Sequence, residues 1–504
     1  MSTSTTTSGP WIKRAADLVI ENRLFIGGQF VEGSQGFDRI SPRDGTVLAS
    51  VSAADEADVD RAVAAARTAF DTGPWPRMKP RERARILQRW ADLIERDRAT
   101  LALLVSLEMG KPIRDSYGVD APAVVRTIRW YAELADKESG EIPDVGVDAL
   151  ALVTRQASGV VGAVVPWNFP ITMAAWKLAP ALAVGCTAVL KPAEQSPLSA
   201  LHLATLAAEA GLPEGVLNVV NGVGSVAGRA LGLHPGVDVL AFTGSTEVGR
   251  HFMHYSADSN LKRVWLELGG KSPNIVFPDA PDLDAAATAA AWAIFFNGGQ
   301  TCTAGSRLLV HEAIAEEFTD LVVAKAAKWI PGDPLEPSTT MGPLVDSEHR
   351  ASVIAHIDRG VADGARLRIG GGIVHEAGTA TPFDDGAYLQ PTVLDHVDRA
   401  SALAQQEIFG PVLGVFTFRD ADDAVAAASD TDYGLAAAIW TADLKTAHRV
   451  SAAIPAGTVW VNCYEEGDMT VPFGGMKLSG HGRDKSTHAL EKYTDLKTTW
   501  ISLG

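Results

Sequence analysis

Cysteine and long apolar runs are scarce in this sequence. Only three cysteines occur in 504 residues, Cys186, Cys302 and Cys463, and their wide spacing suits neither a disulfide framework nor a paired zinc site. No run approaches the ~20 apolar residues of a membrane helix. Residues 1–10 are rich in Ser and Thr and lack the basic and apolar regions of a signal peptide. We therefore expect a cytoplasmic protein with a flexible N-terminal tail at residues 1–20, no structural metal and no membrane partner.

Basic residues are also in deficit. The chain has 44 Lys and Arg against 61 Asp and Glu, a formal charge of -17 at pH 7. Such a charge disfavours a nucleic-acid or anionic-membrane partner and leaves a small molecule as the better expectation. A hydrophobic fraction of 46% with 21% charged residues is ordinary for a globular chain, which at this length has room for two or three domains.

The apolar pattern changes along the chain. Residues 55–137 repeat apolar side chains at helical spacing, with a turn at residues 73–76. From residue 160 onward, short runs rich in β-branched residues alternate with helical segments such as residues 198–210; these runs are residues 160–165, 188–190, 216–220 and 239–242. Strands that alternate with helices predict a parallel sheet with both faces covered, which is an α/β fold.

Cys302 is the candidate nucleophile. It lies in residues 296–305 (FNGGQTCTAG), where glycines and short polar residues allow a small ligand to approach the thiol. A buried cysteine that only fills space is the alternative, because free cysteine is among the most buried residue types. Cys186 and Cys463 lie in apolar runs and fit that alternative better.

Two glycine-containing turns follow predicted strands. Residues 222–228 (GVGSVAG) resemble a dinucleotide-binding fingerprint, but the last spacing is one residue too long and a plain tight turn is equally compatible. Residues 242–249 (FTGSTEVG) open a helix whose free N–H groups could meet a phosphate, although a Ser/Thr helix cap explains them equally well.

Glu267 is a carboxylate at the end of an apolar run, directly before a glycine pair. Burial of a carboxylate is costly, so Glu267 is either part of a structural ion pair or a base with a raised pKa. The final residues, 493–503, alternate as a strand does and could pair with another sheet or another subunit.

Seven motifs in this order resemble the NAD(P)-dependent aldehyde dehydrogenases. They are residues 166–170 (PWNFP), 191–194 (KPAE), 242–245 (FTGS), 266–271 (LELGGK), 299–302 (GQTC), 407–411 (EIFGP) and 472–475 (PFGG). Residues 467–475, 482–486 and 500–503 resemble a narrower group, the γ-glutamyl-γ-aminobutyraldehyde dehydrogenases of putrescine breakdown.

The resemblance implies an aldehyde dehydrogenase fold with three parts. These are a Rossmann-like cofactor domain (residues 21–140 and 158–268), an α/β catalytic domain (residues 269–475) and a small β oligomerisation arm (residues 141–157 and 486–504). The arm implies a homo-oligomer, either a dimer or a tetramer.

The resemblance also implies roles for individual residues. Cys302 attacks the aldehyde, Asn168 and the Cys302 N–H stabilise the oxyanion, Glu267 activates water, and Lys177 supports that region. NAD is the expected cofactor, with NADP as a further possibility, because a carboxylate at Glu194 repels a 2′-phosphate while Lys191 softens that repulsion. The implied cofactor-binding residues are Val165, Trp167, Lys191, Glu194, Gly224, Gly228, Phe242, Ser245, Val248, Leu268, Gly269, Glu407 and Phe409.

Three acidic residues suggest the substrate. Asp120, Glu465 and Asp468 match positions at the substrate entrance of amino-aldehyde relatives, and they suit an aldehyde with a cationic distal group, such as 4-(γ-glutamylamino)butanal or 4-aminobutanal. A solvated acidic loop is the alternative, as is an enzyme of broad aliphatic specificity. A coenzyme-A-acylating relative would lack the base at Glu267. A non-catalytic structural protein of the same fold is disfavoured by Cys302, Glu267 and Asn168 together, and a cysteine protease by the absence of a recognisable His partner motif.

Overall fold

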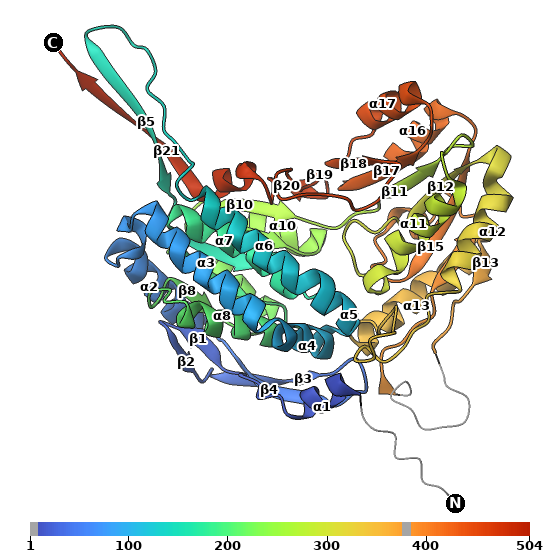
Figure 1. The fold of residues 1–504 in the computed structure, drawn as a ribbon, viewed down its shortest axis with the longest axis horizontal. Helices are drawn as coiled ribbons and strands as arrows, with labels where there is room; N and C mark the ends of the chain where they lie inside the picture. Colours follow the sequence, from blue (N-terminus) through green and yellow to red (C-terminus); the bar gives the residue numbers. More distant parts are fainter. Residues whose placement is uncertain (1–8, 375–384) are drawn as a thin grey trace, which may run out of the picture.

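The predicted apolar runs form the inner strands of a parallel sheet. The computed structural model describes residues 9–374 and 385–504 (Figure 1). Within them the first sheet has the order β2-β1-β8-β7-β6-β9-β10-β20. Its strands are β2 (Gln29–Val31), β1 (Leu24–Ile26), β8 (Leu217–Val219), β7 (Thr187–Lys191), β6 (Val160–Val164), β9 (Val239–Thr243), β10 (Arg263–Glu267) and β20 (Gly480–His481). Strands β8 to β10 are parallel, whereas β1, β2 and β20 join antiparallel at the edges.

Helices cover this sheet, as the alternation of strands and helices predicts. They are α2 (Glu56–Asp71), α3 (Pro80–Arg96), α4 (Arg98–Met109), α6 (Ala121–Leu134), α7 (Pro170–Val184), α8 (Leu198–Glu209), α9 (Arg229–Leu233) and α10 (Thr246–Ala257). Helix α7 is apolar around most of its circumference and is buried almost throughout, as a helix of that composition requires. It begins directly after Phe169, so its first turns face the candidate nucleophile.

A second sheet is built from the later part of the chain, in the order β13-β14-β15-β12-β11-β17-β18. Its strands are β13 (Arg366–Ile369), β14 (Thr392–Asp395), β15 (Val412–Phe418), β12 (Arg307–His311), β11 (Pro273–Val276), β17 (Ala436–Trp440) and β18 (Thr458–Val461). The strands from β14 to β18 are parallel. Its helices are α11 (Leu283–Phe295), α12 (Ala315–Ala326), α13 (Ser347–Ala362), α16 (Ala421–Ser429) and α17 (Leu444–Ala453).

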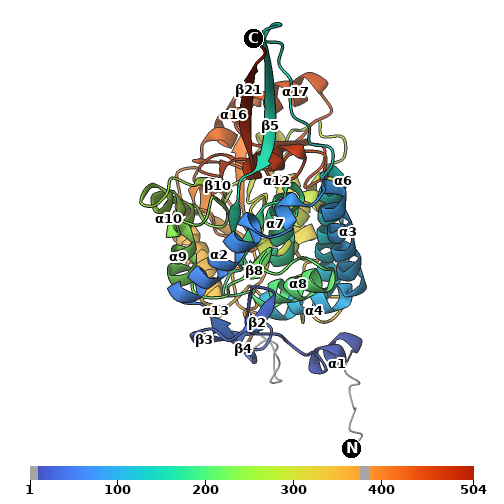
Figure 2. The same ribbon diagram turned by 90° about the vertical axis from the view of Figure 1, so that its left-hand side faces the viewer.

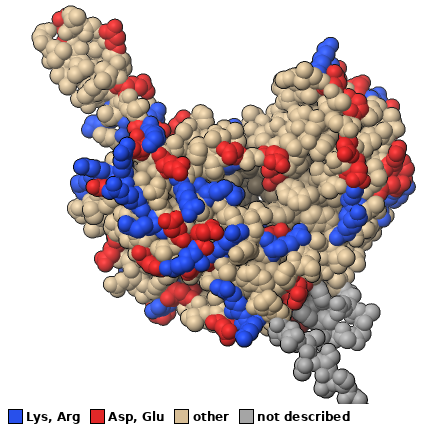
Figure 3. All heavy atoms as spheres, viewed as in Figure 1, with Lys and Arg blue, Asp and Glu red and all other residues tan. Residues whose placement is uncertain are grey.

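An arm of two long strands extends away from the body of the molecule (Figures 1 and 2). Strand β21 (Thr494–Ser502) pairs antiparallel with β5 (Ala149–Ala157), so the predicted C-terminal strand is confirmed. Trp500 and Leu496 are more than half exposed, and few charged side chains cover the arm in the space-filling view of Figure 3. Exposed apolar strand surface of this kind is typical of an interface, and the role of the arm in oligomerisation stays a prediction.

The N-terminal prediction is wrong in part. Within the expected tail at residues 1–20, Pro10–Ala16 form helix α1, and Trp11, Ile12 and Ala15 pack against Leu103 and Leu335. A proline at the first helical position and this apolar contact explain why the segment is ordered. Residues 1–8 lie outside the described ranges. No helix in those ranges combines the length and the apolar content needed to cross a bilayer.

The remaining described elements are short connections or hairpins. They are β3 (Gln35–Ile40), β4 (Val47–Ala53), α5 (Ile113–Asp115), α15 (Ala402–Gln405), β16 (Tyr433–Gly434), β19 (Met476–Lys477), and the helical turns η1 (Trp75–Arg77), η2 (Ser116–Asp120), η3 (Gly224–Gly228), η4 (Phe296–Gly299), η5 (Glu312–Ile314) and η6 (Thr487–Tyr493). Turn η2 ends at Asp120, and turn η4 ends three residues before Cys302; both residues belong to the candidate site.

Candidate active site

A left-handed turn presents Cys302 between the two sheets. Asn297, Gly298 and Gly299 have φ values of 53°, 62° and 74°, a region that glycine adopts without steric cost. A Cβ at Gly299 would lie 2.1 Å from the Gly410 carbonyl oxygen, so the turn also needs glycine for its close approach to the neighbouring loop. The chain therefore bends sharply after α11 and places Cys302 in the segment that leads to β12.

Hydrogen bonds hold this turn against residues 166–170. The Asn297 side-chain amide donates to the Asn168 carbonyl at 3.1 Å, and the Asn168 amide donates to the Gln300 carbonyl at 2.9 Å. Gln300 in turn donates to the Asn297 carbonyl and accepts from the Val345 N–H. The amide of Asn168 is thus held beside Cys302, where a second amide hydrogen is available for an oxyanion.

Two cavities meet at Cys302. The first encloses about 140 Å³ and is mostly apolar; its lining includes Phe169, Met173, Trp176, Phe473, Glu267, Glu465 and Asp120. The second encloses about 240 Å³, and its lining includes Trp167, Asn168, Ser245, Gly269, Glu407 and Phe409. A group on Cys302 therefore has access to both spaces, which suits a reaction between two separately bound molecules.

The Cys302 thiol is neutral in this environment. Burial raises its pKa well above the ordinary range, and the nearby carboxylates of Glu465, Glu407 and Glu267 raise it further. The thiolate is the nucleophilic form, so a base or a bound cation must act before Cys302 reacts. By contrast, Cys186 is fully buried, as predicted, whereas Cys463 is only half-buried and does not match the core interpretation.

Glu267 lies at the end of β10 and lines the first cavity. Burial raises its pKa well above the ordinary value, Asp484 raises it further, and Lys177, Lys492 and Arg483 oppose the shift. In the part of the chain that the structure describes, neither carboxylate oxygen has a hydrogen-bond partner. An unpaired buried carboxyl beside a cavity has the properties of a general base.

Lys177 lies behind Glu267 rather than in the cavity. Its ammonium donates to Asp484 Oδ2 at 2.5 Å, and both side chains are almost completely buried. Lys492 donates to the other oxygen of the same carboxylate. The resemblance implies that Lys177 supports the base, and the structure brings the two groups close enough for their charges to interact.

The second cavity has a carboxylate cradle for a ligand. Glu407 accepts from the Gly270 N–H at 3.0 Å, and a Cβ at Gly269 would lie 2.0 Å from Glu407 Oε2, so only glycine leaves room for this carboxylate. Burial raises the pKa of Glu407 to about 7. Trp167 packs edge-on against Phe409 at a centroid distance of 5.3 Å and completes the wall. Leu268 lines the same cavity.

Lys191 and Glu194 form a second polar pair at the end of β7. Their side chains lie 3.3 Å apart, and Glu194 accepts from the Gly224 N–H at 2.7 Å. Burial opposes the charge of Glu194, but Lys191 and this N–H outweigh it and hold its pKa below the ordinary value. Gly224 and Gly228 lie in η3, and a Cβ at Gly228 would approach the Lys191 stem at 4.0 Å.

The other predicted cofactor-binding residues frame these groups. Ser245 caps α10 by accepting a hydrogen bond from the Val248 N–H, so the alternative of a helix cap applies. The other N–H groups of the first turn of a helix have no partner within the helix and are available to a ligand. Val165 and Phe242 are buried at the ends of β6 and β9, where the carboxyl ends of neighbouring parallel strands meet. This edge of a parallel sheet is the usual place for a ligand. The open cavity, the glycine-lined cradle and the ionised Glu194 together fit a dinucleotide.

The three entrance residues differ in position. Glu465 lines the first cavity, accepts a hydrogen bond from the Thr303 hydroxyl and has its pKa raised to about 7 by burial. Asp120 also lines this cavity but is paired with Lys111 at 2.6 Å; its Oδ1 has no partner among the described residues. Asp468 is exposed and accepts from the Thr470 N–H, outside the lining. The alternative of a solvated acidic loop therefore applies to Asp468 and not to Glu465 or Asp120.

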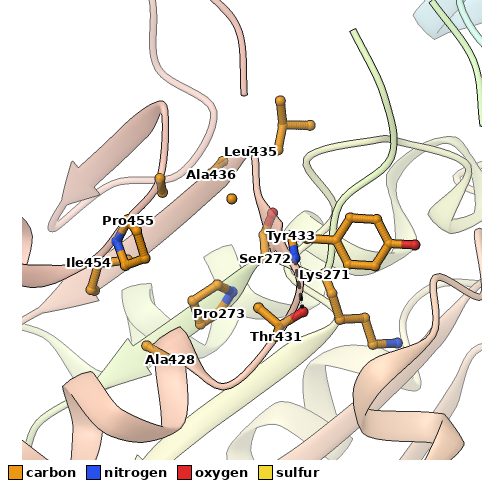
Figure 4. A pocket seen from close by; sticks show the side chains of 12 residues that line it. Lys271, Ser272, Pro273, Ala428, Thr431, Tyr433, Leu435, Ala436, Ile454 and Pro455 are labelled. Atoms are coloured by element: carbon orange, nitrogen blue, oxygen red, sulfur yellow. Dashed lines mark hydrogen bonds between the residues drawn. The ribbon is translucent and has the colours of Figure 1, made fainter. Parts of the chain in front are cut away.

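A smaller pocket lies apart from Cys302, near β16 (Figure 4). It encloses about 10 Å³, and the side chains of Lys271 and Tyr433 point away from Ile454 and Pro455. Such a volume admits no more than about one water molecule, so it is not a substrate site.

Sequence reasoning missed three groups that line the first cavity, Asp484, Thr303 and Trp176, and also Lys492, which contacts Asp484 from outside the lining. Asp484 and Lys492 come from the C-terminal segment, and Thr303 and Trp176 adjoin motifs that were recognised. Residues 482–486 had been noted only as part of the resemblance. A lysine eight residues after an aspartate gives no local signal, because no regular helix joins the two positions.

Comparisons with known proteins agree with this geometry. The family model described as "Aldehyde dehydrogenase family" matches residues 30–499. The chain is 50% identical over 495 residues to the NADP/NAD-dependent aldehyde dehydrogenase PuuC of Escherichia coli, which covers 98% of each chain. It is 47% identical to the aminoacetaldehyde dehydrogenase of Pseudomonas aeruginosa, with 97% of each chain covered.

Solved structures are equally similar. A γ-glutamyl-γ-aminobutyraldehyde dehydrogenase from Burkholderia cenocepacia superposes with a TM-score of 0.95 at 54% identity, covering 98% of this chain and 99% of the other. An indole-3-acetaldehyde dehydrogenase in complex with NAD+ gives 0.96 at 52% identity with the same coverage.

Proposed function

The chain belongs to the aldehyde dehydrogenase family, and on this premise we propose that it oxidises ω-amino and γ-glutamylamino aldehydes to acids with NAD as the preferred oxidant. Oxidation of an aldehyde with a nicotinamide dinucleotide is the activity of the family. The observation that carries the proposal is the position of Cys302 where two cavities meet, one with carboxylates for a cationic substrate and one with a cradle for a dinucleotide.

The first step is attack of the Cys302 sulfur on the aldehyde carbon. Glu465, a carboxyl of the first cavity with a pKa of about 7, accepts the thiol proton, and Glu267 is left for the later hydrolysis. The carbonyl oxygen becomes an oxyanion, which the Asn168 amide and the Cys302 N–H stabilise. Because Asn168 is held by the turn that carries Cys302, donor and nucleophile keep one relative position.

When bound, the dinucleotide supplies the hydride acceptor. Glu407, Trp167 and Ser245 would hold it in the second cavity, and Lys191 with Glu194 would hold its adenosine end. These residues orient the ligand beside Cys302, while the protein itself carries the acyl group as a thioester.

Hydrolysis of the thioester is the proposed role of Glu267. Its carboxylate takes a proton from water, which attacks the acyl carbon and releases the acid from Cys302. This base favours water over coenzyme A as the acyl acceptor. It also disfavours a non-catalytic role, because an unpaired buried carboxyl is a cost that a purely structural protein has no reason to retain.

The substrate assignment is supported by charge in an otherwise apolar cavity. Glu465 and the free Oδ1 of Asp120 face a space walled by Phe169, Trp176 and Phe473. An ammonium group there would favour the ionised form of Glu465, and the aromatic faces would add cation–π attraction. Two relatives that are named for activity on amino aldehydes support this assignment.

A second candidate is a neutral aromatic aldehyde. The aromatic walls and the 52% identity to an indole-3-acetaldehyde dehydrogenase favour it.

We further propose, from the exposed arm and the sequence, that the protein is a homodimer or homotetramer in the cytoplasm. Analytical sedimentation tests the oligomeric state, and localisation of a tagged chain tests the compartment.

Cys302→Ala is expected to abolish dehydrogenase turnover, because no other thiol lies at the junction of the cavities among the described residues. Dinucleotide binding, followed by protein fluorescence quenching, and the unfolding temperature should stay close to those of the wild type. Cys463→Ala is the control and should retain activity. Turnover by Cys302→Ala near the wild-type rate would contradict the proposed role of Cys302 as the nucleophile.

Glu267→Gln is expected to retain a single-turnover burst of NADH while the subsequent steady rate falls roughly 10²–10⁴-fold, as for loss of a general base. The reason is that water must be deprotonated only after the thioester forms. Stopped-flow absorbance separates the two phases. Loss of the burst as well would mean that Glu267 also activates the thiol, contrary to this division of roles.

The kcat/KM with NAD is expected to exceed that with NADP. Glu194→Gln should lower the ratio of these two values by about tenfold, because a negative charge that repels the 2′-phosphate of NADP is removed. Glu209→Gln, which changes a carboxylate paired with Arg96 elsewhere, is the control. A wild-type preference for NADP would contradict the proposed role of Glu194.

Cationic aldehydes should have a higher kcat/KM than hexanal or indole-3-acetaldehyde, and the ratio should grow from pH 6 to pH 8. A carboxyl with a pKa of about 7 is neutral below that value and ionised above it, so Glu465 gains its attraction for an ammonium as the pH rises. Glu465→Gln should reduce this preference about tenfold, because a carboxylate that attracts the ammonium group is lost.

Asp468→Asn is the matched control and should leave that preference unchanged, because the Asp468 carboxylate lies outside the cavity lining. A preference for neutral aldehydes, or equal effects of both amide variants, would refute the substrate assignment while leaving the dehydrogenase activity intact.

A further inference from the structure

Two lysines share one buried aspartate behind Glu267. Lys177 donates to Asp484 Oδ2 at 2.5 Å, and Lys492 donates to Asp484 Oδ1. The exposed fractions of the three side chains are 1% for Lys177, 0% for Asp484 and 3% for Lys492. Solvent therefore screens these charges little, and their balance affects every ionisable group beside them.

The three residues come from separate elements. Lys177 is on α7, which packs on the first sheet, whereas Asp484 follows β20 and Lys492 ends η6 just before the arm strand β21. Lys492 also lies 5.3 Å from the centre of the Tyr493 ring. Its ammonium is thus enclosed by protein on several sides, with Asp484 as its only hydrogen-bond acceptor among the described residues.

Among the four buried groups Lys177, Asp484, Lys492 and Glu267, the charges balance only when Glu267 is ionised; Arg483, which also acts on Glu267, is half-buried and more strongly screened by solvent. One aspartate and two ammonium groups leave a net charge of plus one, which the Glu267 carboxylate cancels. The groups that act on Glu267 are Asp484, Lys177, Lys492 and Arg483, with the Cys302 thiol on the cavity side; the Tyr131 and Tyr493 hydroxyls adjoin Asp484. Lys492 opposes the effects of burial and of Asp484 on the pKa of Glu267.

We propose that Lys492 is a positioning residue for thioester hydrolysis, acting through Asp484 to keep a second ammonium beside Glu267. With Lys177 alone, the aspartate and lysine charges would cancel, and ionisation of Glu267 would place an unbalanced negative charge in the protein interior. Lys492 removes that penalty without contacting substrate or cofactor. The inference rests on the proposed role of Glu267 as the base for water.

A purely structural role for Lys492 is the competing explanation. The lysine also ties η6 to the body of the protein, so its loss could disturb the base of the arm. A structural role would lower the rate or the stability at all pH values alike, whereas an electrostatic role moves the pH at which hydrolysis begins.

The test measures the steady rate that follows the NADH burst as a function of pH, with 4-aminobutanal and saturating NAD. Lys492→Met should shift the acid limb of this rate to higher pH by about one unit, because a positive charge near the carboxyl is lost. The rate at pH 7 should fall about tenfold and should recover toward the wild-type rate at high pH, with the burst retained.

Two further variants separate charge from structure. Asp484→Asn removes a negative charge from the same cluster and should shift the acid limb to lower pH, opposite to Lys492→Met. Lys492→Arg keeps the positive charge, so its steady rate should fall at the same acidic pH as that of the wild type. Lys262→Met is the matched control, because Lys262 is also buried but donates to the Gly232 carbonyl at 2.6 Å, away from Cys302. The pH of the acid limb should be unchanged in this variant.

Each outcome has a separate meaning. A wild-type enzyme without a burst or without an acid limb would refute the proposed role of Glu267. A normal wild-type profile with an unmoved limb in Lys492→Met, or with shifts in the same direction for both variants, would overturn only the role of Lys492. If Lys492→Met does not fold, Asp484→Asn and Lys492→Arg decide, and an unmoved limb in Asp484→Asn overturns the proposal.

Discussion

The desolvation of Glu267 is the constraint on which the rest of the site depends. A carboxylate in an apolar cavity is unstable unless nearby charge compensates it, and this compensation comes from Lys177, Lys492 and Arg483 against the opposing charge of Asp484. These partners belong to α7, which packs on the first sheet, and to the C-terminal segment just before the arm strand β21. The environment of the base therefore depends on both parts of the chain. The pKa of Glu267 is therefore a property of the whole fold.

The same reasoning applies to Cys302. Its thiol lies where the two sheets meet, and the turn that carries it is tied to Asn168 and to Val345 by backbone and side-chain hydrogen bonds. Burial raises the pKa of the thiol well above its ordinary value. A reactive cysteine that is neutral at rest is protected from unwanted chemistry, and positive charge brought near it would favour the thiolate.

Charge in the substrate cavity is arranged in a similar way. Asp120 is balanced by Lys111, whereas Glu465 has, among the described residues, the Thr303 hydroxyl as hydrogen-bond donor and a more distant Lys485 as the cation that lowers its pKa. Of the two carboxyl groups, Glu465 is thus the one whose ionisation a ligand can change. An aromatic cavity with one such group can accept apolar aldehydes and still distinguish a cationic one.

The sequence by itself determined the alternation of strands and helices, the glycine turn before Cys302 and the conspicuous carboxylate Glu267, because these are local patterns with local causes. Only the tertiary structure decided that α1 is ordered, that Asp468 faces solvent, that Asp120 is paired with Lys111 and that Lys492 meets Asp484. The physical reason is that burial and charge pairing arise when segments far apart in the chain pack together. No spacing rule along the sequence encodes which of several acidic residues will lose its water.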